Sequence, residues 1–147
     1  MKIAIGCDHA AYNEKNKLIE YLESKDIEIF DLGCDSEDSV DYPDYAHMVC
    51  NHIKENKSDK GILICGSGIG ISIAANRNKG IRAALCCSEF HAEMSRKHND
   101  ANVIALGARI TSLENMCKFI DIFLDTEFEG GRHQNRLEKI ELWHIKN

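Results

Sequence analysis

The sequence has 147 residues, 44% of them hydrophobic and 29% charged, which predicts a single globular domain over residues 1–147. The formal net charge of -6 argues against nucleic acid or an anionic membrane surface as the main partner. Seven cysteines form no Cys-x-x-Cys pair, and the N-terminus does not resemble an export signal. We therefore expect free thiols in a reducing cytoplasm and no membrane association.

Short apolar runs alternate with segments of helical spacing along the chain. The apolar runs predict five strands, at residues 2–6, 27–32, 62–64, 81–86 and 103–106. The intervening segments predict helices at residues 13–25, 42–53, 71–76, 88–98 and 113–124, with a last helix that begins within 129–136 and ends near 145. This alternation predicts an α/β fold with three αβα layers, in which a Rossmann-like, five-stranded parallel sheet carries helices on both faces, with a C-terminal helix at the end.

Local signals support several of these helices. Ser88 and Ser112 stand where N-cap residues belong, and Pro43, the only proline, falls in a predicted first turn. In the helix after Ser88, we expect Phe90 and Met94 to face the core.

The most informative stretch follows the third predicted strand. Cys65 stands at the strand end, and Gly66, Gly68 and Gly70 follow at alternate positions, with Ser67 between the first two. Glycines permit positive φ and remove the Cβ atoms that keep a ligand away from the backbone. The amide groups can then converge on an anion or an oxyanion, and the same field is expected to lower the pKa of the Cys65 thiol.

Other polar residues also follow predicted strands. Asp8 and His9 come after the first strand and Arg109 after the fifth, at the edge where open α/β sheets bind ligands. Arg132 and Arg136 are four residues apart, so they share one face of the last helix and suit a phosphate. We expect these residues, together with His98 and Asn99 before the fifth strand, to converge on one edge of the sheet.

Each feature also has an ordinary structural interpretation. The glycine loop can be a tight turn over a buried Cys65, and the arginine pair can be a solvated helix face. His9 and His98 can be structural histidines, and Asp8 can cap a loop. The spacing excludes a Walker loop, a Cys-x5-Arg phosphatase loop and a dinucleotide fingerprint after the first strand, and no common metal-ligand spacing is present.

Seven blocks of the sequence together resemble ribose-5-phosphate isomerases of type B, whose wider family includes allose-6-phosphate and galactose-6-phosphate isomerases. The blocks are Gly6-Cys-Asp-His9, Asp41-Tyr-Pro-Asp-Tyr45, the stretch from Gly61 to Asn76, Gly80-Ile-Arg-Ala83, His98-Asn-Asp100, Gly107-Ala-Arg109 and Glu129-Gly-Gly-Arg-His-Gln-Asn-Arg136. The resemblance extends in order over essentially the whole chain.

The resemblance implies an aldose–ketose isomerase that interconverts ribose 5-phosphate and ribulose 5-phosphate through an enediol, with no metal and no organic cofactor. It implies that Cys65 is the base and that His98 opens the furanose ring, with Asp8 and Ser67 assisting. The implied substrate contacts are His9, Tyr42, Gly66, Ser67, Gly68, Ile69, Gly70, Asn99, Arg109, Arg132 and Arg136. It also implies a homodimer or homotetramer with sites between subunits.

Two positions refine this resemblance. Ser67 stands where many members carry threonine, so the hydroxyl is kept. Ile71 stands where a branch without the cysteine carries glutamate, so the chain resembles the cysteine branch. A hexose-6-phosphate isomerase and a non-catalytic phosphosugar or nucleotide sensor are the alternatives.

Overall fold

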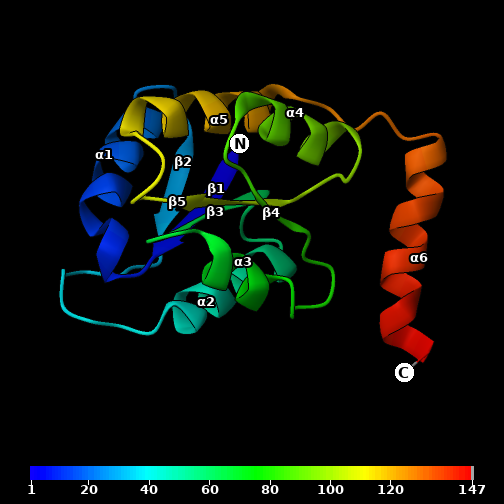
Figure 1. The fold of residues 1–147 in the computed structure, drawn as a ribbon, viewed down its shortest axis with the longest axis horizontal. Coiled ribbons are helices and arrows are strands. Elements are labelled where there is room, and N and C mark those ends of the chain that lie inside the picture. Colours follow the sequence, from blue (N-terminus) through cyan, green and yellow to red (C-terminus); the bar gives the residue numbers. More distant parts are fainter. Residues whose placement is uncertain (147) are drawn as a thin grey trace.

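The computed structural model describes the backbone of residues 1–146 and the side chains of residues 1–142. Its centre is one parallel sheet of five strands in the order β2-β1-β3-β5-β4 (Figure 1). The strands are β1 (Lys2–Cys7), β2 (Glu28–Asp31), β3 (Lys60–Cys65), β4 (Ala83–Leu85) and β5 (Val103–Gly107). The predicted five-stranded parallel sheet is therefore confirmed, with a shorter β4 than the apolar run suggested.

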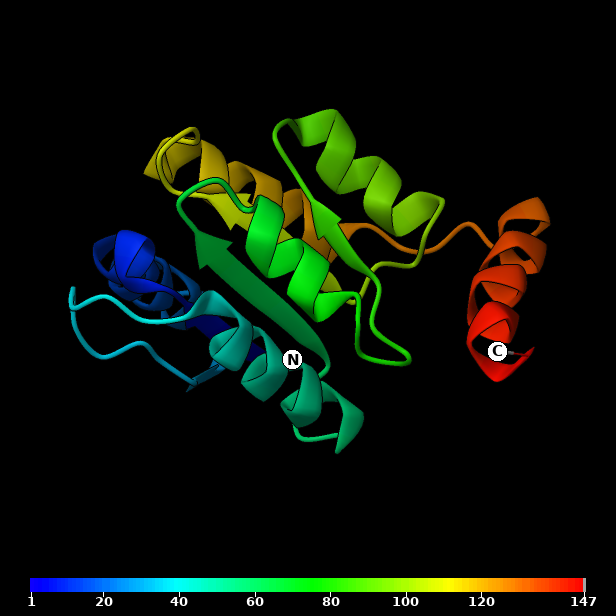
Figure 2. The same cartoon turned by 60° about the horizontal axis from the view of Figure 1, so that its bottom comes forward.

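Helices cover both faces of the sheet (Figures 1 and 2). One face carries α1 (Tyr12–Glu23), α4 (Glu89–Lys97) and α5 (Leu113–Asp125), and the other carries α2 (Tyr42–Lys54) and α3 (Ile69–Ala75). A short 3-10 helix, η1 (His9–Ala11), follows β1 and was not expected from the sequence. The last helix, α6 (Arg132–Lys146), stands to one side of this layered body at the end of an extended segment (Figure 1).

Side chains alternate between the two faces of the sheet along β3, and this alternation determines the face to which Cys65 points. Ile62 and Ile64 pack into the core beneath α1 and α5, whereas Leu63 and Cys65 face the core beneath α2 and α3. Successive side chains of a strand point to opposite faces, and a central parallel strand is buried on both. Cys65 therefore lies on the same side of the sheet as α3, which follows it.

The local helix signals are mostly confirmed. The Ser88 and Ser112 hydroxyls cap α4 and α5 by accepting hydrogen bonds from the amides of His91 and Asn115. The inward orientation of Phe90 is wrong, because this side chain is 66% exposed. α4 instead turns a stripe of smaller or hydrogen-bonded residues to the core, namely Ala92, Ser95 and Arg96.

Each helix within residues 1–146 is too short or too polar to cross a membrane.

Candidate active site

The glycine loop after β3 wraps its backbone around the Cys65 sulfur. The amide of Gly68 donates a hydrogen bond to Cys65 Sγ over 3.1 Å, although the side chain as a whole is only 4% exposed. Gly68 adopts φ 77°, and a Cβ atom there would lie 2.9 Å from the Leu106 carbonyl carbon. Glycine thus permits both the turn and its close approach to β5. A donor aimed at sulfur stabilises negative charge on it.

Beyond the sulfur, the loop presents further amide groups at the surface. Ser67 is exposed, and its Oγ accepts a hydrogen bond from the Ile69 amide over 3.3 Å. The amides of Ser67 and Gly70 donate to no acceptor among the described residues and both residues retain exposed surface, whereas Ile71 is fully buried. The Gly68 amide of the expected anion cradle thus bonds to the Cys65 sulfur, and the Ile69 amide bonds to Ser67 Oγ. The amides of Ser67 and Gly70 can still donate hydrogen bonds to an oxygen of a bound ligand.

Arg109 brings a positive charge over the same loop. Its backbone amide donates to the Gly66 carbonyl over 3.0 Å, and the neighbouring Ala108 amide donates to the Cys65 carbonyl over 2.9 Å. A Cβ atom on Gly66 would lie 3.3 Å from the Arg109 guanidinium carbon. Two backbone hydrogen bonds therefore hold the segment after β5 against the glycine loop, and the Arg109 guanidinium lies over Gly66.

Asp8 and His9 occupy the neighbouring strand end. The Asp8 amide donates to the Ile64 carbonyl over 3.1 Å, and its carboxylate caps η1 by accepting from Ala10 N over 3.0 Å. His9 Nδ1 accepts a hydrogen bond from the Val40 amide over 3.2 Å. Since Nδ1 acts as the acceptor, the ring proton of neutral His9 resides on Nε2, which can donate to a ligand.

Tyr42, at the start of α2, closes the other side of the loop. A Cβ atom at Gly70 would lie 2.6 Å from Tyr42 Cζ, so the phenol ring rests directly on that glycine. The ring is 38% exposed. Asp8, Cys65, Tyr42 and Arg109, which the sequence singled out separately, thus surround one loop at the carboxyl edge of the sheet.

His98 and Asn99 lie at the opposite edge of the sheet, so their expected convergence with Cys65 is wrong within a single chain. His98 is the C-cap of α4, whose chain direction is opposite to that of the strands. Just beyond it, the Asn102 carbonyl accepts from the amide of Gly61, at the start of β3. Cys65 is at the other end of that six-residue strand, about 13 Å from Gly61 at ~3.3 Å per residue.

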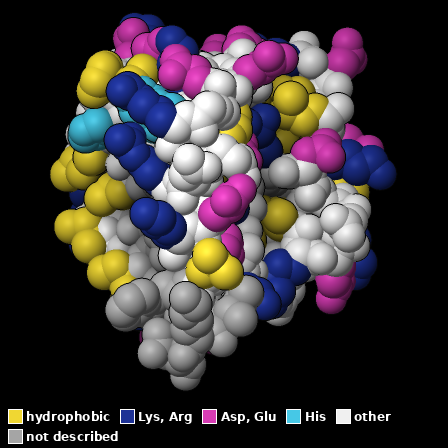
Figure 3. Space-filling view, turned by 90° about the vertical axis from the view of Figure 1, so that its right-hand side faces the viewer, with side chains coloured by type: hydrophobic (Ala, Val, Ile, Leu, Met, Phe, Trp, Pro, Cys, Tyr) yellow, Lys and Arg dark blue, Asp and Glu magenta, His cyan; other side chains and the backbone are white. Residues whose placement is uncertain are grey.

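The arginine pair belongs to this second group. Arg132 and Arg136 are exposed on the first turns of α6, and neither side chain contacts a carboxylate among the described residues. Figure 3 views the side of the molecule on which α6 stands, and basic side chains gather there in a column beside histidine. Acidic side chains lie elsewhere in the same view, but this column of basic side chains suits an anionic ligand.

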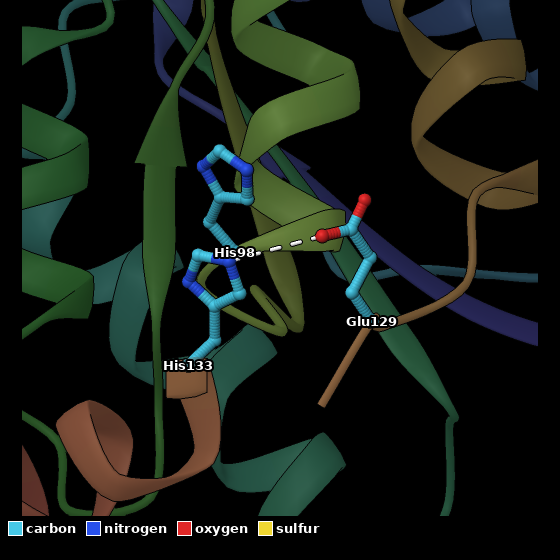
Figure 4. Close-up of side chains that lie close together, drawn as sticks. All are labelled: His98, Glu129 and His133. Atoms are coloured by element: carbon cyan, nitrogen blue, oxygen red, sulfur yellow. Dashed lines mark ion pairs between the residues drawn. The ribbon is translucent and has the colours of Figure 1, made fainter. Parts of the chain in front are cut away.

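Three side chains meet where α6 approaches the end of α4 (Figure 4). The His98 and His133 rings are stacked, with centroids 4.3 Å apart and planes 11° apart, and Glu129 Oε2 lies 3.8 Å from His133 Nε2. The potential ligand atoms of the three residues lie within 4.8 Å of one another. However, an ion in the plane of one stacked imidazole lies out of the plane of the other, so the arrangement does not fit a metal without ring rotation.

Sequence reasoning assigned no role to Glu129 or His133. Their spacing of four residues, next to the arginine pair, was the available signal. The stacking on His98 depends on how α6 meets α4, which local pattern does not reveal.

A hollow of ≈ 400 Å³ lies between α6 and the β4 side of the sheet. Asn99 and Arg82 line it from the body, and Leu137 and Ile140 line it from α6. Cys65 does not contribute to this hollow. Within one chain, this hollow is therefore separate from the glycine loop.

Comparison with known proteins identifies the fold family. The family model described as Ribose/Galactose Isomerase matches residues 3–140. The chain belongs to the ribose/galactose isomerase family. It is 45% identical to the ribose-5-phosphate isomerase B of Escherichia coli strain K12 over 139 residues, which cover 95% of this chain and 93% of that protein.

Solved structures of this family superpose closely on the chain. The ribose-5-phosphate isomerase B of Clostridium thermocellum has a TM-score of 0.98 at 46% identity, covering 99% of both chains. The enzyme of Mycoplasma genitalium, whose structure contains bound ribulose 5-phosphate, has a TM-score of 0.95 at 40% identity, covering 99% of this chain and 97% of that one. The three-layer fold predicted from the sequence is thus that of the family.

Proposed function

We infer that this chain is an aldose–ketose isomerase that interconverts D-ribose 5-phosphate and D-ribulose 5-phosphate, a step of the pentose phosphate pathway. The observation that carries this conclusion is the Cys65 sulfur held by the Gly68 amide at the edge of a loop with free donors. Membership of the family and the relative with bound ribulose 5-phosphate support the same substrate.

The proposed chemistry moves one proton between neighbouring carbons. In the open-chain aldose, the Cys65 thiolate removes the C2 proton, the C1 carbonyl oxygen takes up the negative charge, and an enediolate forms. The thiol then returns the proton to C1, the proton of the C2 hydroxyl passes to the C1 oxyanion, and the C2 oxygen becomes the carbonyl. Charge develops on oxygen in this step, and each preorganised donor of the loop typically contributes ~3 kcal/mol to its stabilisation. The amides of Ser67 and Gly70, which are not fully buried and donate to no acceptor among the described residues, are available for this purpose.

Ribose 5-phosphate is mostly a closed furanose, so its ring must open before the proton transfer. We assign this step to His98, which takes up the proton of the C1 hydroxyl as a base and delivers a proton to the ring oxygen as an acid, with Asp8 positioning sugar hydroxyls. His9, Arg132 and Arg136 grip the phosphate, while Tyr42, Asn99 and Arg109 make further substrate contacts. Phosphate binding remote from the reacting carbons supplies energy for positioning.

The separation of the two residue groups supports a site shared between two subunits. Cys65 and His98 lie at opposite edges of the sheet, and α6 lies to one side of the layered body of its own chain (Figure 1). In a symmetric dimer, α6 and the α4 end of one subunit can complete the glycine loop of the other. We propose such a homodimer, either alone or paired into a tetramer.

Seven cysteines without a disulfide support a reducing compartment, and we propose a cytoplasmic enzyme.

Deuterium uptake tests the assigned chemistry. The wild-type protein in D2O is expected to interconvert the two pentose phosphates and to exchange the transferred proton with solvent. Cys65→Ala should fold normally and lose about 10²–10⁴-fold in kcat, the typical contribution of a positioned base. Near-normal turnover by this variant would refute Cys65 as the base. The panel should include allose and galactose 6-phosphates, since kcat/KM decides the preferred sugar.

Mixing two inactive variants tests the shared site. Cys65→Ala and His98→Ala subunits, unfolded together and refolded in equal amounts, form mixed dimers with one intact site each. Random pairing then restores about one quarter of wild-type activity. If each chain held a complete site, mixing would restore nothing.

A further inference from the structure

His133 forms an aromatic platform for the histidine assigned to ring opening. Its ring lies parallel to that of His98, with a centroid separation of 4.3 Å and an interplanar angle of 11° (Figure 4). His133 is only 4% exposed, whereas His98 is half-buried and retains an accessible side. One face of the His98 ring is therefore covered by a fixed neighbour.

The backbone on both sides fixes this stack. The amide of Glu129 donates to the Lys97 carbonyl over 3.1 Å, which ties the segment before α6 to the residue preceding His98. The His133 amide donates to the Gly130 carbonyl over 3.1 Å. Gly130 and its neighbour Gly131 have positive φ values of 66° and 56°, which turn the chain back toward α4.

The surroundings of His133 favour a neutral ring. Burial lowers the pKa of His133, and the nearby His98, Arg132 and Arg136 lower it further, whereas Glu129 acts in the opposite direction. A neutral imidazole does not compete with His98 for a proton. Protons pass between imidazoles through in-plane nitrogen atoms, and stacked rings instead present their faces to each other. The geometry therefore suits support of the ring rather than proton relay.

We propose that His133 is a positioning residue, whose stacked ring fixes the plane of His98 for opening of the sugar ring. This inference rests on the proposed function and deepens it. A nitrogen that delivers a proton to the ring oxygen must point at it, and small misplacements of a catalytic group cost large factors in rate. The flat face is the essential property, and the ring nitrogens of His133 are dispensable.

Substrate chemistry provides a way to isolate the ring-opening step. Ribose 5-phosphate closes to a furanose through O4. Ribulose 5-phosphate has its carbonyl at C2 and its O5 phosphorylated, so it has no free hydroxyl that can close a five-membered ring. Solvent-proton exchange at C1 of ribulose 5-phosphate therefore needs the base and the oxyanion donors, but no ring opening. Turnover of ribose 5-phosphate needs the base, the oxyanion donors and ring opening.

The test compares two substitutions that both remove the ring nitrogens. His133→Phe keeps a flat aromatic face, and His133→Leu fills the space without one. We expect His133→Leu to lower kcat with ribose 5-phosphate about 10–100-fold, with KM nearly unchanged, and His133→Phe to stay within about threefold of wild type. Deuterium exchange into ribulose 5-phosphate should stay within about twofold in both. His91→Ala, at an exposed histidine on α4, the helix that ends at His98, is the matched control and should behave as wild type.

Several outcomes would overturn the proposal. Equal activity of the Leu and Phe variants, whether both are normal or both slow, would show that the aromatic face is not used. Equal loss of turnover and exchange in His133→Leu would indicate a general structural role, as would its failure to fold. Loss of activity after dialysis against EDTA would assign the cluster to a metal. If wild type itself shows neither turnover nor exchange, the proposed function fails instead.

Discussion

Replacing Gly68 with alanine tests whether the cysteine loop depends on a backbone conformation that only glycine adopts freely. Gly68 has φ 77°, and a Cβ atom there would meet Leu85 Cδ1 at 2.6 Å and the Leu106 carbonyl carbon at 2.9 Å. The left-handed conformation costs about 1–2 kcal/mol for a non-glycine residue. Forcing a methyl group against backbone adds about 1–3 kcal/mol. Together we expect a loss of roughly 2–5 kcal/mol in the free energy of unfolding.

Two further glycines separate these contributions. Gly80 has φ 79° but nothing within 4 Å of its Cβ position, so Gly80→Ala should show the conformational cost alone, about 1–2 kcal/mol. At Gly66 the backbone φ is not in the left-handed region, and the Cβ position meets only the flexible Arg109 side chain, at 3.3 Å. Gly66→Ala should therefore stay within about 1 kcal/mol of wild type in stability, while displacement of Arg109 lowers kcat/KM.

Urea unfolding followed by circular dichroism measures these differences, at one protein concentration because assembly contributes to apparent stability. Gly68→Ala should lose at least about 1 kcal/mol more than Gly80→Ala. Its kcat should also fall, since movement of the Gly68 amide removes the hydrogen bond to Cys65 Sγ. The reasoning is refuted if Gly68→Ala is as stable as Gly80→Ala.

Five other substitutions probe the phosphate grip and the fold. Arg132→Ala should raise KM for ribose 5-phosphate about 10–100-fold, because a charge-assisted hydrogen bond is lost, and Arg136→Ala should act similarly; unchanged KM in steady-state kinetics would contradict this. The buried Lys15 ammonium pairs with Asp31 over 2.6 Å. Asp31→Ala removes this partner and should lower the free energy of unfolding, measured in urea, by about 3–5 kcal/mol. Lys15→Met removes the buried charge as well and should lower it less. Ser112→Ala removes the cap of α5 and should cost about 1 kcal/mol, which thermal unfolding can measure.

The sequence alone determined the sheet and one half of the candidate site. Apolar runs that alternate with helical segments permit little besides a parallel sheet, and parallel strands end at a common edge. Asp8, Cys65 and Arg109 follow three such strands, and so they meet in the structure as the pattern predicts. Local chemistry was equally informative at Ser88 and Ser112, because a helix cap needs only a neighbouring amide.

The features that depend on the placement of the helices were decided by the tertiary structure alone. The sequence did not reveal that His98, at the end of α4, lies at the edge opposite Cys65, or that α6 lies to one side of the layered body. It predicted an inward Phe90, although the stripe that α4 buries lies elsewhere. The stacking of His133 on His98 joins two segments by packing, which no local periodicity encodes. The parallel sheet follows from the chain pattern, but the meeting of helix ends follows from the packing of the whole fold.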